Sequence, residues 1–112
     1  MNGSKISIKF NYLYRDAGNY KRYGSVVYTN HTNISLIKIE NTIRENLIDG
    51  EYFIADEWQV PSLFFETSNP DDHHWHEFSN VELTEDIATS ILDIKEFISQ
   101  LLSPTANRSS VY

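Results

Sequence analysis

A chain of 112 residues with 40% hydrophobic and 13% aromatic content is long enough to bury one core, which excludes a disordered protein and indicates a single domain. The absence of cysteine excludes disulfides, thiolate metal sites and a cysteine nucleophile. Because the net charge of −7 repels phosphate backbones, we expect no nucleic-acid partner and consider a basic protein partner more natural.

The start of the chain indicates where the protein works. Residues 1–5 lead directly into a strand-like pattern without the apolar stretch of a signal peptide, and no segment is long and apolar enough for a membrane helix. The missing cysteines fit a reducing compartment. We therefore expect a cytoplasmic protein without a membrane partner. Residues 1–103 should form the single α+β domain, and residues 104–112 a flexible C-terminal tail.

The first third of the chain has the pattern of a β-hairpin. Apolar and polar residues alternate over residues 5–14, which predicts a half-buried strand. Gly18 and Asn19 then supply the conformational freedom that a reversal needs, and β-branched and aromatic residues resume over residues 20–29. The inward-facing residues of the first strand would be Ile6, Ile8, Phe10, Tyr12 and Tyr14.

A helix is expected after this hairpin. Ser35 is a suitable N-cap, apolar residues follow at helical spacing on one face, and Gly50 should end the helix. The apolar positions are Leu36, Ile39, Ile43 and Leu47. A helix with a single apolar stripe is expected to lie across one face of a sheet.

The middle of the chain is rich in aromatic residues but interrupted by Pro61. We expect a short strand or extended segment near residue 52, a turn around Pro61, and another short strand at residues 62–66. A further strand is expected over residues 75–84. Its apolar residues Phe78 and Val81 are separated by an odd number of positions, which predicts a bulge or a turn at Ser79-Asn80.

The last expected element is a helix that begins near Thr89 or Ser90, where Ser90 and Asp93 have capping-box spacing, and runs to about Leu102. Its buried face would consist of Ile91, Ile94, Phe97, Ile98 and Leu101. The element order is then ββαβββα. This order predicts an α+β fold, with an antiparallel sheet of four to five strands and both helices on one face.

The run of residues 71–77 contains three of the four histidines, three carboxylates and one of the two tryptophans. On a strand, His74 and His76 share one face and are able to chelate a divalent metal ion together with Asp72 from the preceding turn. This metal is the one cofactor that the sequence suggests. Alternatively, the run forms a polar loop and edge strand in which Trp75 packs as an anchor.

Aromatic and charged residues elsewhere suggest contacts with a partner. Tyr52 and Trp58 lie in the acidic, aromatic segment 49–58, and together with Trp75 they are candidate interface anchors. Alternatively, they are core aromatics flanked by solvated charges. Arg15 begins a charged turn that would hold an anion or an acidic patch of a partner, or that only keeps a hairpin tip soluble.

Three segments, at residues 12–21, 47–51 and 74–78, resemble small single-domain bacterial proteins of unknown function. The resemblance covers about half of the chain and implies a bacterial, cytoplasmic setting. It implies no activity and no site residue.

Two functional hypotheses follow from these observations. The first is a non-enzymatic binding or protein-interaction module that self-associates as a homo-oligomer or docks a basic protein surface through exposed aromatics and carboxylates. The alternative is a small divalent-metal-dependent hydrolase that activates water with His74, His76 and Asp72. We favour the first, because a pair of histidines at this spacing is common by chance.

Overall fold

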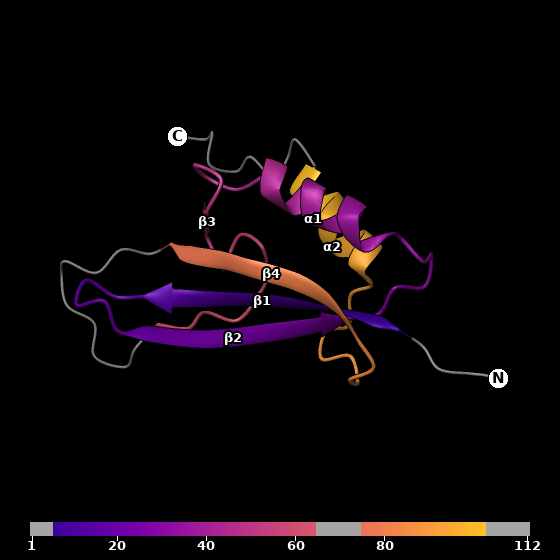
Figure 1. Cartoon of the computed structure of the whole chain (residues 1–112), viewed down its shortest axis with the longest axis horizontal. Coiled ribbons are helices and arrows are strands. Elements are labelled where there is room, and N and C mark those ends of the chain that lie inside the picture. The colour runs from indigo at the N-terminus through magenta and orange to yellow at the C-terminus, as the bar shows by residue number, and fades with distance from the viewer. Residues whose placement is uncertain (1–5, 65–74, 103–112) are drawn as a thin grey trace.

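The computed structural model describes residues 6–64 and 75–102. The strands are β1 (Ser7–Arg15), β2 (Lys21–Tyr28), β3 (Tyr52–Phe53) and β4 (His76–Thr84), and the helices are α1 (Leu36–Glu45) and α2 (Ile94–Leu102). The strands form one antiparallel sheet in the order β2-β1-β4-β3 (Figure 1). The predicted tail at residues 104–112 lies outside the described residues.

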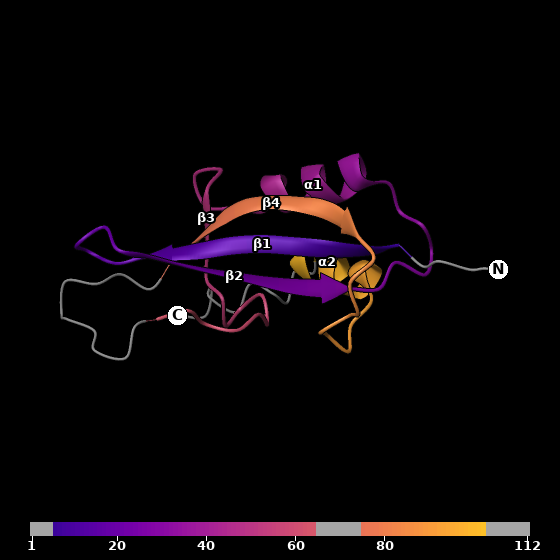
Figure 2. The same cartoon turned by 60° about the horizontal axis from the view of Figure 1, so that its bottom comes forward.

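The predicted α+β class is confirmed, with both helices on the same side of the sheet (Figures 1 and 2). Neither helix in the described part of the chain is long and apolar enough to cross a membrane. The observed element order is ββαββα. It differs from the predicted order by one strand, the one expected at residues 62–66.

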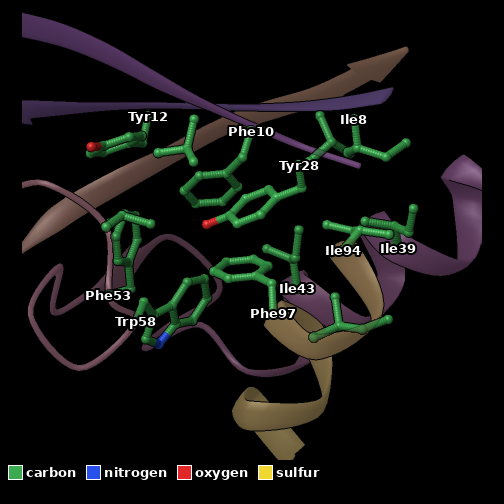
Figure 3. Packing of buried hydrophobic residues seen from close by; sticks show 14 of the residues in the cluster. Ile8, Phe10, Tyr12, Tyr28, Ile39, Ile43, Phe53, Trp58, Ile94 and Phe97 are labelled. Carbon is green, nitrogen blue, oxygen red and sulfur yellow. The ribbon is translucent and has the colours of Figure 1, made fainter. Parts of the chain in front are cut away.

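Alternating residues of the central strand β1 build the core. Ile8, Phe10 and Tyr12 are at most 1% exposed and lie on the side of the sheet that faces the core cluster (Figure 3). Phe10 lies at the centre of an aromatic cluster, because five other rings have their centroids between 5.4 and 6.2 Å from its own. Those rings belong to Tyr12, Phe53, Trp58, Phe78 and Phe97. Burial of these large aromatic surfaces is the main contribution to stability.

Of the bulge or turn predicted at Ser79-Asn80, the structure shows a bulge in the strand β4. Asn11 of β1 pairs with Asn80, whereas the next residue, Tyr12, pairs with Phe78. The register shift leaves Ser79 as the extra residue. Without it, strand alternation would send Phe78 and Val81 to opposite faces of the sheet; with it, both pack against the core.

Helix α1 starts as predicted but ends earlier. The hydroxyl of Ser35 accepts a hydrogen bond from the backbone N–H of Lys38, which satisfies one free donor of the first turn. At the other end the helix stops at Glu45, and the side chain of Asn46 donates to the carbonyl of Thr42. Gly50, expected to end the helix, instead belongs to a separate turn with φ of 72°.

Helix α2 begins later than predicted, because its first turn is capped by Asp93 and not by Ser90. Asp93 accepts a hydrogen bond from the backbone of Lys95, while Glu96 accepts one from the backbone of Asp93. This is a capping box with an aspartate at the N-cap. The backbone N–H groups of residues 89 and 90 instead bond to the carbonyl of Val27. Ile91 therefore precedes the helix and is fully exposed, contrary to the prediction.

Residues 62–64 do not form the strand that was expected there, and residues 65 and 66 lie outside the described part. Side chains satisfy this backbone in place of a strand partner. The hydroxyl of Tyr12 donates to the carbonyl of Pro61 at 2.6 Å, and the backbone N–H of Leu63 donates to His76 at 2.9 Å. The segment thus crosses the core face of the sheet and does not extend it.

The acidity of Asp93 makes the stability of the fold depend on pH. Partial burial alone raises the pKa of Asp93, but hydrogen bonds from the backbone of His31 and Lys95 and from a threonine hydroxyl outweigh burial and lower it. A lowered pKa stabilises the fold above the unfolded-state value of about 4, and this stabilisation is lost as the pH falls through the folded-state pKa.

We expect Asp93→Asn to lower the free energy of unfolding by about 1 kcal/mol at about pH 7, and by less at about pH 3. Urea unfolding at both pH values measures this difference. Asp86→Asn is the control, because it also replaces an aspartate by asparagine but at an exposed position. The Asp86 carboxylate makes a long contact, 3.7 Å, with the Lys9 ammonium. An Asp93→Asn effect of equal size at both pH values contradicts the prediction.

Two buried tyrosines should differ in how the loss of their hydroxyl changes the unfolding free energy. The hydroxyl of Tyr28 is buried without a hydrogen-bond partner in the described part of the chain, whereas that of Tyr12 donates to Pro61. Burial raises the pKa of Tyr12 to about 12, so its hydroxyl stays protonated. We expect Tyr12→Phe to cost about 1 kcal/mol of unfolding free energy and Tyr28→Phe to cost nothing or to stabilise. Denaturant unfolding of both variants tests this, and the reverse order refutes it.

Candidate functional site

A surface pocket of about 380 Å³ opens where the end of β1 meets β3 and β4. Its volume falls in the range of small-ligand sites, roughly 300–1,000 Å³. We call it the acidic-aromatic pocket; it is lined by Arg15, Asp49, Glu51, Tyr52, Trp75 and Glu77.

Strand pairing brings the lining residues together. Glu77 of β4 is paired with Leu13 of β1 on one side and with Tyr52 of β3 on the other. Because side chains alternate along a strand, Glu77 and Arg15 lie on the sheet face opposite to the core. The pocket and the core therefore occupy opposite faces of the same strands.

Arg15 and Glu77 form the ion pair of the pocket. Nε and Nη2 of Arg15 donate to the two carboxylate oxygens of Glu77 at 2.9 and 3.2 Å, and Nη1 donates to Oδ1 of Asn19 at 2.7 Å. The hydrogen bond and the charge of Glu77 raise the pKa of Arg15. The Arg15 guanidinium is thus already engaged on both sides, which favours a structural role for this residue over capture of a free anion.

Two aromatic rings form the apolar wall of the pocket. The ring centroids of Tyr52 and Trp75 are 5.9 Å apart, and their planes are inclined by 50°. Tyr52 is half-buried, and Trp75 is 39% exposed. The pair therefore combines packing with ring surface that is open to solvent.

A tight turn places two carboxylates at the pocket. Asp49 and Gly50 have φ values of 54° and 72°, and the backbone N–H of Glu51 donates to the carbonyl of Ile48. Two successive positive φ values are typical of a type I′ turn, for which Asp-Gly is a favoured sequence. The turn is closed by two backbone hydrogen bonds between Ile48 and Tyr52, of 2.7 and 3.0 Å.

The described lining residues are negatively charged overall. Asp49, Glu51 and Glu77 carry three carboxylates against the guanidinium of Arg15, which leaves these residues with a net charge of −2. In the described ranges, 6–64 and 75–102, no three histidine, aspartate or glutamate side chains converge as a metal site. The three carboxylates of the pocket are therefore not part of such a cluster.

The candidate contact residues fall into two places. Arg15, Tyr52 and Trp75, although far apart in sequence, all line the acidic-aromatic pocket. Trp58 does not join them, because it is 7% exposed and stacks on Phe53 inside the core with ring centroids 4.6 Å apart. For Trp58 the alternative interpretation, a core aromatic, describes its position.

Asp49 and Glu77 line the pocket but are not among the binding or metal-site residues predicted from the sequence. The Asp-Gly pair at residues 49–50 was a usable signal, since this dipeptide between apolar segments favours a tight turn. For Glu77 the sequence offers no such signal. Its place in the pocket depends on the pairing of β4 with both β1 and β3.

One histidine of the run at residues 71–77, His76, lies in the core. Asp72 and His74 lie outside the described residues, so the proposed metal set stays a prediction. His76 is fully buried, and its Nε2 accepts the hydrogen bond from Leu63, which occupies the lone pair that a metal would need. Four aromatic rings surround it at centroid distances of 5.1 to 6.0 Å. They belong to Tyr12, Tyr14, Phe53 and Phe64.

Comparison of the chain with protein-family models, with curated proteins and with solved structures found no match. The function is therefore argued from the geometry and charge of the pocket.

His76 is expected to stabilise the fold through its acceptor nitrogen. His76→Leu removes the acceptor of the Leu63 N–H and should lower the unfolding free energy by about 1–3 kcal/mol. His76→Gln keeps an acceptor and should cost less. Amide hydrogen exchange at Leu63 reports the bond directly, with faster exchange expected in the leucine variant. Equal stability and equal exchange in both variants would show that the hydrogen bond contributes nothing.

Proposed function

We propose that the protein is a non-enzymatic interaction module that binds a positively charged segment of a partner protein and holds one cationic side chain in the acidic-aromatic pocket. The observation that carries this proposal is the composition of the pocket, whose described residues combine two aromatic rings with a net charge of −2.

Charge supports the proposal at long and short range. The whole chain carries −7, which attracts basic partners and speeds their encounter. At the pocket, Asp49 and Glu51 are exposed and able to accept hydrogen bonds from an incoming cation. The rings of Tyr52 and Trp75 add cation–π attraction, worth roughly 0.5–1 kcal/mol at an exposed site.

The chemistry of the lining supports binding over catalysis. Among the described lining residues there is no serine, threonine, histidine or lysine, so this part of the lining offers no usual nucleophile with a neighbouring base. The cation of this lining, Arg15, is paired with Glu77. The pocket offers a concave shape and negative charge, which are the properties needed to bind a cationic side chain.

The test is calorimetric titration with a capped glycine-serine peptide that carries two arginines and two lysines, and with the same peptide in which glutamines replace the four basic residues. We expect a dissociation constant on the order of 0.1–1 mM for the basic peptide, and weaker binding as salt rises to about 0.5 M. Glu51→Gln and Trp75→Leu should each weaken binding by about two- to fivefold.

The matched control is Glu45→Gln, which removes one charge from the exposed surface of α1 at a residue that does not line the pocket. It should bind like the unaltered chain. Equal losses in Glu45→Gln and Glu51→Gln would mean that the net charge, and not the pocket, attracts the peptide. Absence of binding at about 5 mM peptide contradicts the proposal as a whole.

A further inference from the structure

We infer that the side chain taken by the acidic-aromatic pocket is arginine and not lysine. This inference rests on the proposed function, because it names the cation that the pocket selects. Three observations on the described residues support it: the two exposed carboxylates, the flat ring surfaces, and an internal example of the same arrangement elsewhere on the chain.

The pocket offers two exposed carboxylates to an incoming cation. Asp49 and Glu51 line it and are exposed. By contrast, both oxygens of Glu77 already accept hydrogen bonds from Arg15. A lysine ammonium concentrates its charge and its three donors on one nitrogen. A guanidinium distributes five N–H donors over three nitrogens, which suits it to contact two carboxylates at once.

The wall of the pocket favours a flat cation. Tyr52 and Trp75 offer ring surface beside the carboxylates, and Trp75 is open to solvent over 39% of its surface. A guanidinium stacks on aromatic faces and is more weakly hydrated than an ammonium. It therefore loses less hydration energy when it moves from water to a ring face.

The same combination of ring and carboxylate already holds an arginine on another part of this chain. The guanidinium carbon of Arg44 lies 4.9 Å from the ring centroid of Phe78, and Nε of Arg44 donates to Glu40 at 2.8 Å. The acidic-aromatic pocket repeats these parts, with two rings and two exposed carboxylates around a space of about 380 Å³.

Three capped glycine-serine peptides test the inference, carrying a single arginine, a single lysine or a single citrulline, the neutral relative of arginine. Binding is followed by ¹⁵N NMR through the indole N–H signal of Trp75, assigned by its loss in Trp75→Phe. We expect the arginine peptide to bind at least about threefold more tightly than the lysine peptide. The citrulline peptide should bind at least about tenfold more weakly than the arginine peptide, because it has lost the charged contact.

The outcomes separate this inference from the proposed function. Equal affinity for arginine and lysine overturns the selection of arginine while leaving a cation-binding module. Citrulline binding as tightly as arginine overturns the inference as well, because charge is then not recognised. If none of the three peptides shifts the Trp75 signal, the pocket binds no such side chain and the proposed function fails with it.

Variants of the pocket test the inference through the ratio of arginine to lysine affinity, which a general loss of charge does not change. Trp75→Leu should reduce the arginine-to-lysine ratio toward one, measured on backbone signals of residues 49–52, because it removes the face on which the guanidinium stacks. Glu45→Gln should leave the ratio unchanged. A ratio that Trp75→Leu does not alter, in a variant whose unfolding midpoint shows that it is folded, overturns the role given to the ring.

Discussion

The pairing of β1 with β4 is the interaction on which the rest of the structure depends. It joins strands that are distant in sequence and places β1 in the interior of the sheet, with β2 on its other side. One face of β1 then delivers Phe10 to the centre of the aromatic cluster (Figure 3). The other face delivers Arg15 to the ion pair with Glu77. Core and pocket are consequences of one strand pairing.

Strand alternation gives the neighbours His76 and Glu77 different roles. His76 points into the core and anchors the backbone of Leu63, while Glu77 points outward and pairs with Arg15. The rigid core behind the pocket has a functional benefit: residues held on paired strands keep their positions when a partner binds, so less conformational entropy is lost. The pocket combines such residues with the carboxylates of the turn at residues 49–51, which is closed by its own hydrogen bonds.

Features that depend on neighbouring residues in the chain could be predicted. These include the first hairpin, the N-cap at Ser35 and the bulge between Phe78 and Val81, since each follows from local periodicity or capping chemistry. The start of α2 could not, because residues 89 and 90 bond to Val27, a residue far away in sequence. That tertiary contact outweighs the local capping signal of Ser90 and moves the cap to Asp93.

The sequence by itself determined the α+β class, the acidic character and the alternation of the first strand, because these depend on composition and on the period of apolar residues. Only the tertiary structure decided which exposed residues meet. It placed Tyr52 and Trp75 beside Arg15 at the pocket and left Trp58 in the core. The sequence alone makes both tryptophans candidate interface anchors. The reason is that a pocket requires long-range strand register, which no local pattern of residues encodes.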